Sequence, residues 1–292
     1  MFFNVFGACP LTLWSPPALV LLLAALLLLG SLAYWQLVVA EGVHLGQRVV
    51  SLLYDGTAHR YDAIKCFNSD DEDLFLGAPL AQALRLATPL VLDVACGTGR
   101  LPRTLLSQPE FHGKVVGLDA SRRMLAKAGQ LLGDGVPLIW QVAERLPFDD
   151  ASFDAVTCLE ALEFMPSAPR ALAEIGRVLR PGGLLLTTNR VGPAARWLPG
   201  HTLSTPALEQ LLASLGFEQV RAQIWQVEYD LVWARRGGSE GGKREHAYGL
   251  AAILCCPHCR TRLGRVAGAW RCGACERIYP VAPDDIIEML NR

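Results

Sequence analysis

The longest apolar stretch of the chain runs from Ala18 to Ala40 and contains no charged residue. As a helix rising about 1.5 Å per residue, this stretch would span about 30 Å of hydrocarbon with some tilt. Trp14 precedes it, and Tyr34 and Trp35 lie near its far end, where amphipathic aromatic rings favour a membrane interface. The pattern predicts a membrane-anchoring helix over about residues 18–40.

Two other interpretations of this stretch are weaker. A cleaved signal peptide usually has basic residues before a shorter apolar region, but no Lys or Arg precedes Ala18. A buried core helix would normally carry a polar face, and this stretch has none. Arg48, Arg60 and Lys65 follow the stretch, so the positive-inside tendency predicts a single-pass protein whose globular body is cytoplasmic.

Beyond residue 88 the pattern changes to short apolar runs separated by amphipathic segments. The predicted strands are Pro89–Val94, Lys114–Asp119, Pro137–Val142, Phe153–Leu159 and Gly183–Asn189. The predicted helices between them are Leu101–Gln108, Ser121–Leu132 and Pro169–Leu179. Strands that alternate with helices and lack a polar face indicate an α/β protein with a buried parallel sheet. Two further runs without a helix between them should form an antiparallel edge pair: Phe217–Gln226 and Val227–Arg235.

Length and charge limit the classes of protein that fit this pattern. A chain of 292 residues can hold one domain of ordinary size with appendages. Its formal net charge of -1 lacks the basic excess of a dedicated nucleic-acid-binding protein. The charge is uneven, because residues 235–292 contain ten Lys or Arg and six Asp or Glu. The C-terminal part is therefore the part best suited to meet phosphate on lipid or RNA.

A glycine-rich turn follows the first predicted strand, in the sequence Asp93-Val-Ala-Cys-Gly97-Thr-Gly99. Such a turn between a strand and a helix lets a ligand approach the backbone closely at the carboxyl edge of the sheet. The third glycine of a dinucleotide-binding turn and the Lys-Ser/Thr of a phosphate-binding loop are both absent. Asp93 suits a ligand with a cationic amino-acid end, and Asp119, at the end of the second strand, is placed to accept hydrogen bonds from ribose hydroxyls.

Residues from about Tyr54 to Arg235 resemble the class I S-adenosylmethionine-dependent methyltransferases, especially the ubiquinone and menaquinone C-methyltransferases. The resemblance rests on ordered motifs: Tyr61-Asp62, the glycine turn, Gly117-Leu-Asp119-x-Ser121, Arg145-Leu-Pro-Phe148, Ser152-Phe-Asp154 and Leu179-Arg-Pro-Gly-Gly183. It implies a Rossmann-like, seven-stranded sheet and a methyltransferase activity. It also implies that Asp93, Gly97 and Gly99 line the methionine end of the cofactor.

The same resemblance implies that Asp119 binds the ribose and that Met124 lies near the adenine. Many members of the family have an aspartate before the alanine that matches Ala143, where it binds the adenine amino group. This chain has Val142 at that position, so Glu144 or the backbone would have to substitute.

The sequence does not identify the methyl acceptor. The segment after the fourth predicted strand lacks the Asn/Asp-Pro-Pro-Tyr motif that usually marks methyltransferases of adenine or glutamine amides. Methyl transfer depends mainly on positioning, so no general base is assigned. The candidate residues on the acceptor side, for each of which a packing role is the alternative, are Glu160, Glu163, Arg196, Trp197 and His201.

Four of the nine cysteines form two C-x-x-C pairs near the C-terminus. Cys256, Cys259, Cys272 and Cys275 have the spacing of a structural zinc ribbon, which folds only with its metal. The other five are expected to be buried free thiols in a reducing compartment: Cys9, Cys66, Cys96, Cys158 and Cys255.

Residues 252–292 resemble the small zinc-ribbon activator subunit of tRNA and translation-factor methyltransferases. The continuation Ile278-Tyr-Pro-Val281 and the final Met289-Leu290 carry this resemblance, whereas Asp284-Asp-Ile-Ile287 replaces the usual Asp-Gly-Ile-Pro. The resemblance implies that the module supports its own methyltransferase domain.

The expected organisation is an anchor at 1–45, a methyltransferase domain at 46–235, a glycine-rich flexible linker at 236–251 and a zinc ribbon at 252–292. The leading hypothesis is a membrane-surface methyltransferase, with S-adenosylmethionine and zinc as cofactors, acting on a small or lipid-soluble acceptor such as a quinone, isoprenoid or lipid precursor. The alternatives are a tRNA or protein methyltransferase, with nucleic acid as a less favoured partner, and an inactive zinc-ribbon adaptor.

Overall fold

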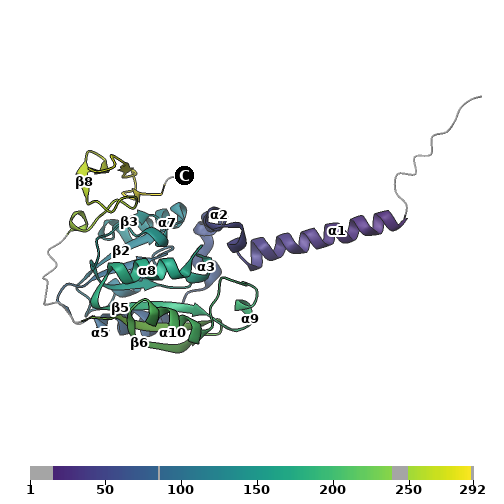
Figure 1. The fold of residues 1–292 in the computed structure, drawn as a ribbon, viewed down its shortest axis with the longest axis horizontal. Helices are drawn as coiled ribbons and strands as arrows, with labels where there is room; N and C mark the ends of the chain where they lie inside the picture. Colours follow the sequence, from purple (N-terminus) through teal and green to yellow (C-terminus); the bar gives the residue numbers. More distant parts are fainter. Residues whose placement is uncertain (1–15, 85, 239–248, 291–292) are drawn as a thin grey trace, which may run out of the picture.

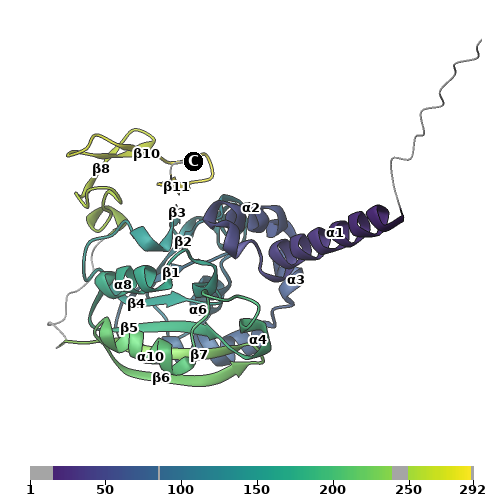
Figure 2. The same cartoon turned by 45° about the vertical axis from the view of Figure 1, so that its right-hand side comes forward.

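The computed structural model describes residues 16–84, 86–238 and 249–290. Helix α1 (Pro16–Tyr34) continues through the π-helical turn η1 (Trp35–Val39) and projects away from the rest of the chain (Figures 1 and 2). Within the described ranges, Pro17–Val39 is the one helix long and apolar enough to cross a membrane. The helix expected at 18–40 is therefore present, and Trp14 lies outside the described residues.

A group of short helices joins α1 to the sheet. In chain order they are η2 (Val43–Leu45), α2 (Gln47–Thr57), η3 (Ala58–Arg60), α3 (Tyr61–Lys65), α4 (Ser69–Glu72), η4 (Asp73–Gly77) and α5 (Ala78–Ala83). Asp55 ties α2 to the start of α7 (Arg122–Leu132), because its Oδ1 accepts hydrogen bonds from Ser121 Oγ at 2.6 Å and Arg123 N at 2.9 Å. The segment that follows the apolar helix is thus fastened to the catalytic body.

Eight strands form the main sheet, in the order β11-β3-β2-β1-β4-β5-β7-β6. Seven belong to the body: β1 (Leu90–Val94), β2 (Lys114–Asp119), β3 (Leu138–Trp140), β4 (Phe153–Cys158), β5 (Leu179–Arg190), β6 (Phe217–Gln226) and β7 (Tyr229–Arg236). β7 runs antiparallel to both β5 and β6, and the other neighbours are parallel. The expected seven-stranded Rossmann-like sheet and its antiparallel pair are confirmed, and the C-terminal module adds an eighth strand.

Helices cover both faces of this sheet, which explains why β1 is buried at every position. α8 (Ala168–Val178) and α10 (Thr205–Ser214) pack into one large hydrophobic cluster, whereas α5 and α6 (Arg100–Leu106) pack into another. The remaining short elements of the body are η5 (Gly133–Gly135), η6 (Ala143–Arg145), η7 (Leu162–Phe164) and α9 (Gly192–Ala195).

The C-terminal module is small and built around a three-stranded antiparallel sheet. Its elements are η8 (Leu250–Ala252), β8 (Leu263–Val266), β9 (Ala269–Cys272), β10 (Ile278–Pro280) and β11 (Ile287–Glu288). Trp270 and Tyr279 are buried in the same hydrophobic cluster as the body's α8 face. The module therefore shares a core with the body.

The boundary between body and module lies partly outside the described residues. β7 continues to Arg236, so the first residue of the expected linker, 236–251, belongs to the sheet. Residues 239–248, most of that linker, are outside the described ranges.

Candidate cofactor cleft and thiolate cluster

The glycine turn after β1 leaves open space above its backbone. Gly97 and Gly99 adopt positive φ angles of 55° and 83°, which favour glycine. A Cβ on Gly99 would lie 2.7 Å from Leu132 Cδ1, so this position also permits close packing on α7. A Cβ on Gly97 would meet no atom within 4 Å. Gly97 therefore borders space for a ligand, and Gly99 shapes the turn.

Asp119, at the end of β2, joins the second strand to the glycine turn. Its Oδ2 accepts a 2.8 Å hydrogen bond from Gly97 N, and its Oδ1 accepts one of 2.7 Å from Ser121 N. Burial raises the pKa of Asp119 to about 6, although the amides of Ser121 and Gly97 lower it. These two hydrogen bonds fix the Asp119 carboxylate beside the glycine turn.

Asp93 is the next-to-last residue of β1 and lies deeper in the site than Asp119. Its Oδ1 accepts a 2.6 Å hydrogen bond from Thr157 Oγ1 on β4, and the residue is 3% exposed. Burial raises the pKa of Asp93 to about 7, although this hydroxyl lowers it. Two carboxyl groups with raised pKa values therefore stand at the carboxyl edge of adjacent strands, as expected for a binding site.

A cleft with about 690 Å³ of empty space, including its open mouth, lies over these strand ends. Five of the residues expected to bind the cofactor line it: Gly97, Asp119, Met124, Ala143 and Glu144. Asp93 lines an adjoining hollow of about 390 Å³, which also borders Gly97. Gly99 lines neither space. The structure therefore gathers the expected residues around one continuous edge of the sheet.

The wall at the expected adenine position is formed by residues after β3. Val142 lines the cleft at this position, and Glu144 Oε1 accepts a hydrogen bond of 3.2 Å from Ser167 N. Gln141 lines the cleft as well. Its Oε1 accepts from Val142 N at 2.8 Å, and its Nε2 donates to Met289 O of the C-terminal module at 3.3 Å. The module therefore contacts this wall directly.

The candidate acceptor-side residues lie in three different surroundings. Glu160 lines both the cleft and the hollow. Glu163 is 2% exposed and accepts a 2.5 Å hydrogen bond from Tyr229 Oη, so it is part of the core. Arg196 and Trp197 are exposed, and His201 packs edge-on against His44; none of these three lines either space.

Sequence analysis did not identify the roof of the cleft. Four residues of α2 line it: Gln47, Val50, Ser51 and Tyr54. Their spacing along one face of an amphipathic helix was the available signal. Tyr61, from the Tyr-Asp motif, lines both the cleft and the hollow.

The four cysteines of the two C-x-x-C pairs come together in the C-terminal module. All four Sγ atoms lie within 4.8 Å of one another, with 3.6 Å between Cys256 and Cys275 and 3.3 Å between Cys259 and Cys272. Four thiolates around zinc, at a Zn–S distance of about 2.3 Å, would be separated by about 3.8 Å, so this donor set fits the metal. Of the other cysteines, Cys96, Cys158 and Cys255 are buried as expected.

The expectation of a buried free thiol does not hold for Cys66, and for Cys9 it is not tested. Cys66 is exposed, because it follows α3 in a left-handed conformation at the molecular surface, so its expected burial is wrong. Cys9 lies outside the described residues.

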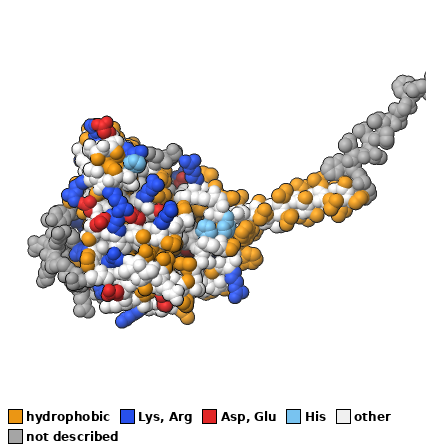
Figure 3. All heavy atoms as spheres, viewed as in Figure 1, with side chains coloured by type: hydrophobic (Ala, Val, Ile, Leu, Met, Phe, Trp, Pro, Cys, Tyr) orange, Lys and Arg blue, Asp and Glu red, His pale blue; other side chains and the backbone are white. Residues whose placement is uncertain are grey.

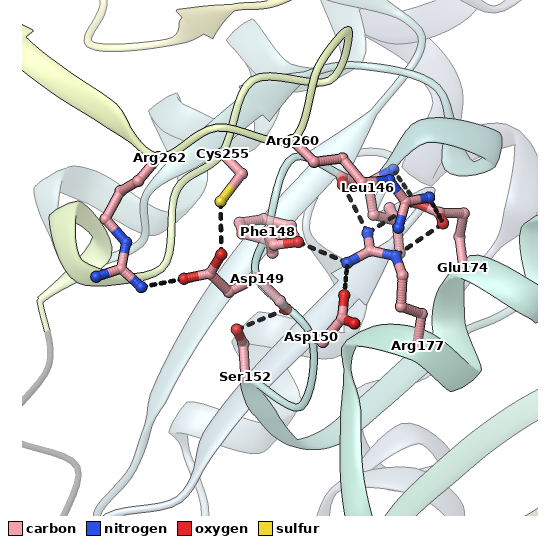
Figure 4. A network of polar contacts seen from close by, with 10 residues as sticks. All are labelled: Leu146, Phe148, Asp149, Asp150, Ser152, Glu174, Arg177, Cys255, Arg260 and Arg262. Carbon is pink, nitrogen blue, oxygen red and sulfur yellow. Dashed lines mark hydrogen bonds and ion pairs between the residues drawn. The ribbon is translucent and has the colours of Figure 1, made fainter. Parts of the chain in front are cut away.

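A polar network of Asp149, Glu174 and Arg177 with Cys255, Arg260 and Arg262 joins the module to the body (Figure 4). Asp149 accepts hydrogen bonds from Cys255 Sγ at 2.8 Å and from Arg262, and Arg260 Nη2 donates to Glu174 Oε1 at 2.8 Å. Glu174 also pairs with Arg177 at 2.8 Å. Two of the module's arginines are therefore committed to acids of the body.

The eighth strand forms a second contact between module and body. β11 pairs in parallel with β3, and Met289 N and Leu290 N both donate to Trp140 O at 3.0 Å. Arg122 of α7 reaches Asp284 at 2.7 Å and Glu288 at 2.8 Å. The module thus extends the sheet at the strand that carries the adenine-side wall.

Comparisons with known proteins agree with this geometry. The family model described as "Methyltransferase domain" matches residues 92–187. The demethylmenaquinone methyltransferase of Symbiobacterium thermophilum is 34% identical over 158 residues, which are 52% of this chain and 63% of that protein. The 2-phytyl-1,4-naphtoquinone methyltransferase of Synechococcus elongatus is 30% identical over 177 residues, 56% of this chain and 69% of that protein. The chain thus spans a little under two thirds of the first relative and slightly more of the second.

A solved structure supports the fold of the body. The complex of the Haloferax volcanii Trm112 methyltransferase activator with a methyltransferase aligns with a TM-score of 0.52 at 20% identity, covering 63% of this chain and 98% of that one. Fold, ordered motifs and sequence relatives together show that the chain belongs to the class I S-adenosylmethionine-dependent methyltransferases.

Proposed function

We propose that this protein methylates a lipophilic acceptor, such as a quinone, an isoprenoid or a lipid precursor, at a membrane surface. The observation that carries the proposal is the position of the apolar helix. The chain leaves α1 at Tyr34, passes through the turns η1 and η2, and from Gln47 forms α2, which roofs the cofactor cleft. Two of the relatives described above are named for quinone substrates, which supports the same class of acceptor.

The junction between α1 and the cleft is a compact cluster. Trp35 stacks on His44 with ring centres 5.3 Å apart, and His44 meets His201 edge-on at 5.0 Å. Ala40, Val43 and Val50 share a hydrophobic cluster with Phe164 and Leu198, and Val50 and Phe164 also line the cleft. With α1 in a bilayer and the body on the cytoplasmic side, the mouth of the cleft would lie near the lipid surface. Tethering of this kind concentrates the enzyme near membrane-dissolved acceptors.

The cofactor roles we propose follow the geometry of the strand ends. Asp93 and Gly97 would hold the methionine end, Gly99 would shape the turn that carries Gly97, and Asp119 would accept hydrogen bonds from the ribose hydroxyls. Met124, Ala143 and Glu144 would surround the adenine. When bound, S-adenosylmethionine would supply a methyl group activated by its positively charged sulfur: the methyl–sulfur bond would break as the methyl joins the acceptor, S-adenosylhomocysteine would leave, and the acceptor would release one proton to water. The protein's part is alignment of the acceptor opposite that sulfur and exclusion of water.

We also propose that Cys256, Cys259, Cys272 and Cys275 hold one structural zinc ion. The short separations among the four Sγ atoms support this, as does a 3.0 Å contact between Cys256 Sγ and Tyr279 Oη, whose hydroxyl can donate to a thiolate. The bound ribbon would brace the adenine-side wall through β11 and β3. Two of its arginines, Arg260 and Arg262, give little support to a nucleic-acid substrate, because they pair with acids of the body.

The acceptor class can be tested with the full chain in vesicles of phosphatidylethanolamine and phosphatidylglycerol. Cofactor carrying a radiolabelled methyl group is supplied together with lipid extract, tRNA or protein extract from the source cells. We expect label in the organic phase only, and a parallel sample of the Asp93→Asn variant should lose it. Label in the tRNA or protein fraction would identify the competing substrate class instead.

A further inference from the structure

The hollow beside the cleft contains a buried arginine that none of the roles above uses. Arg100 is the first residue of α6, directly after the glycine turn, and lines this hollow together with Asp93 and Gly97. Its side chain is 11% exposed. Ion pairs to two acids hold it in place, from Nε to Glu72 Oε2 at 2.6 Å and from Nη1 to Glu160 Oε1 at 2.8 Å. The guanidinium is thus rigid and largely shielded from water.

Aromatic rings fix the plane of the same group. The Arg100 guanidinium carbon lies 4.3 Å from the centre of the Phe67 ring and 5.3 Å from that of Trp225. Among the described residues, its Nη2 is buried and has no hydrogen-bond partner. A buried donor without a partner is costly, and a preorganised guanidinium is suited to bind a carboxylate. The arrangement therefore leaves one strong donor available beside the glycine turn.

Glu160 provides the opposite charge in the same hollow. It has a left-handed backbone with a φ of 49°, which is uncommon for a residue with a long side chain, and Lys65 Nζ lies 3.3 Å from its Oε2. Although burial acts in the other direction, Arg100 and Lys65 hold the pKa of Glu160 below its ordinary value. The hollow is therefore bordered by one cationic side chain, Arg100, and by the carboxyl groups of Glu160 and Asp93. This pattern matches a zwitterion, the form of a free amino-acid end at neutral pH.

We propose that Arg100 binds the α-carboxylate of the methionine end of S-adenosylmethionine through Nη2, while Asp93 and Glu160 face its α-ammonium group. This proposal rests on the proposed function, since it assigns part of the same cofactor. The proposal gives a role to the two acids that pair with Arg100. Glu72 and Glu160 would hold the guanidinium at the position where the cofactor's carboxylate binds. The proposal also moves Glu160 from the acceptor side of the site to the cofactor side.

Decarboxylated S-adenosylmethionine is the probe for this contact, because it lacks only the carboxylate. We measure binding of both ligands to the full chain in detergent micelles by calorimetry. The wild type should bind the cofactor at least tenfold more tightly than the decarboxylated form. Arg100→Gln should weaken binding of the cofactor about 10- to 100-fold, the range for loss of a charge-assisted hydrogen bond, and should leave the decarboxylated form within about threefold.

Two further variants separate recognition from folding. Arg103→Gln on the same helix removes a partly buried ion pair to Asp62 outside the hollow and should keep the wild-type preference for the carboxylate. The double variant Arg100→Gln, Glu72→Gln removes both partners of one ion pair, so it avoids leaving Glu72 as an unpaired buried acid and should show the same loss of preference.

The proposal is overturned if the wild type prefers the cofactor by less than about threefold, or if the Arg100 variants weaken both ligands equally. If the wild type binds neither ligand, the proposed function itself fails, so the two failures are distinguishable.

Discussion

The backbone amide of Gly97 donates a 2.8 Å hydrogen bond to the carboxylate of Asp119. This contact joins the turn after β1 to the end of β2, the two places where the methionine end and the ribose of the cofactor are expected. The side-chain hydroxyl of Thr157 on β4 likewise donates a 2.6 Å hydrogen bond to the carboxylate of Asp93. Neighbouring parallel strands therefore position the binding groups before a ligand arrives, which lowers the entropic cost of binding.

Replacement of Asp119 by alanine should weaken binding of S-adenosylmethionine about 10- to 100-fold, because a charged partner for the ribose hydroxyls is lost. Calorimetric titration of the full chain measures the change. Asp134→Ala, at an exposed position after α7, is the matched control and should bind as the wild type does. Unchanged affinity in Asp119→Ala would remove this residue from the ribose site.

Cofactor affinity should fall as the pH drops below neutrality. Burial raises the pKa of Asp93 to about 7 and that of Asp119 to about 6, so both groups begin to bind protons in the free protein within the range of pH 5 to 7. An ammonium group and ribose hydroxyls bind best to ionised carboxylates, so protons compete with the cofactor. Affinity should decrease progressively below pH 7.

Titrations between pH 5 and 8.5 measure this dependence. Asp93→Asn should bind more weakly at pH 8 and should lose the part of the pH dependence centred near pH 7. An affinity that stays level from pH 5.5 to 8 in the wild type would show that neither carboxyl group must ionise for binding.

Local motifs made the centre of the site predictable. The strand and turn from Asp93 to Gly99 need special backbone angles that glycine supplies, so the sequence identifies them without knowledge of the tertiary structure. The same holds for Cys256, Cys259, Cys272 and Cys275, whose spacing sets the geometry of a tetrahedral site.

The parts that could not be predicted depend on residues far apart in the chain. Arg100 pairs with Glu160 across 60 positions, and nothing in the local pattern of either residue indicates the partner. β11 contributes only two residues to the main sheet, too few to produce a period in the sequence. Ile286, Ile287 and Met289, around this strand, are buried in the folded protein, and such contacts cannot be read from so short a segment.

Removal of the apolar helix should release the protein from membranes. The stability of the shortened protein should depend on how many residues after the helix are also removed. The full chain should resist high-salt and carbonate washes, whereas chains that lack residues 1–34 or 1–45 should be released. Ala40 and Val43 are 0% and 4% exposed. Their loss in the shorter chain should lower the free energy of unfolding by about 2–4 kcal/mol, seen as a lower melting temperature than that of the chain cut at residue 34. A mature N-terminus near Glu41 in the cell would instead establish a cleaved signal peptide.

Loss of one zinc ligand should affect the cofactor site as well as the ribbon. Elemental analysis should find one zinc per chain, and Cys272→Ser should lower that content. Because β11 pairs with β3 and Met289 O accepts from Gln141 Nε2 in the cleft wall, unfolding of the ribbon should lower the melting temperature of the body and weaken cofactor binding.

Cys255→Ser is the matched control for that experiment. Cys255 precedes Cys256, a proposed zinc ligand, but its thiol donates to Asp149 on the body, and a serine hydroxyl can do the same. We expect this variant to keep its zinc and to lose little stability. If Cys255→Ser lost the metal, the ligand set would have to be reassigned. If Cys272→Ser lost zinc but kept the wild-type melting temperature and cofactor affinity, the ribbon would not brace the catalytic body, since loss of a bracing element must destabilise the native state to which it binds.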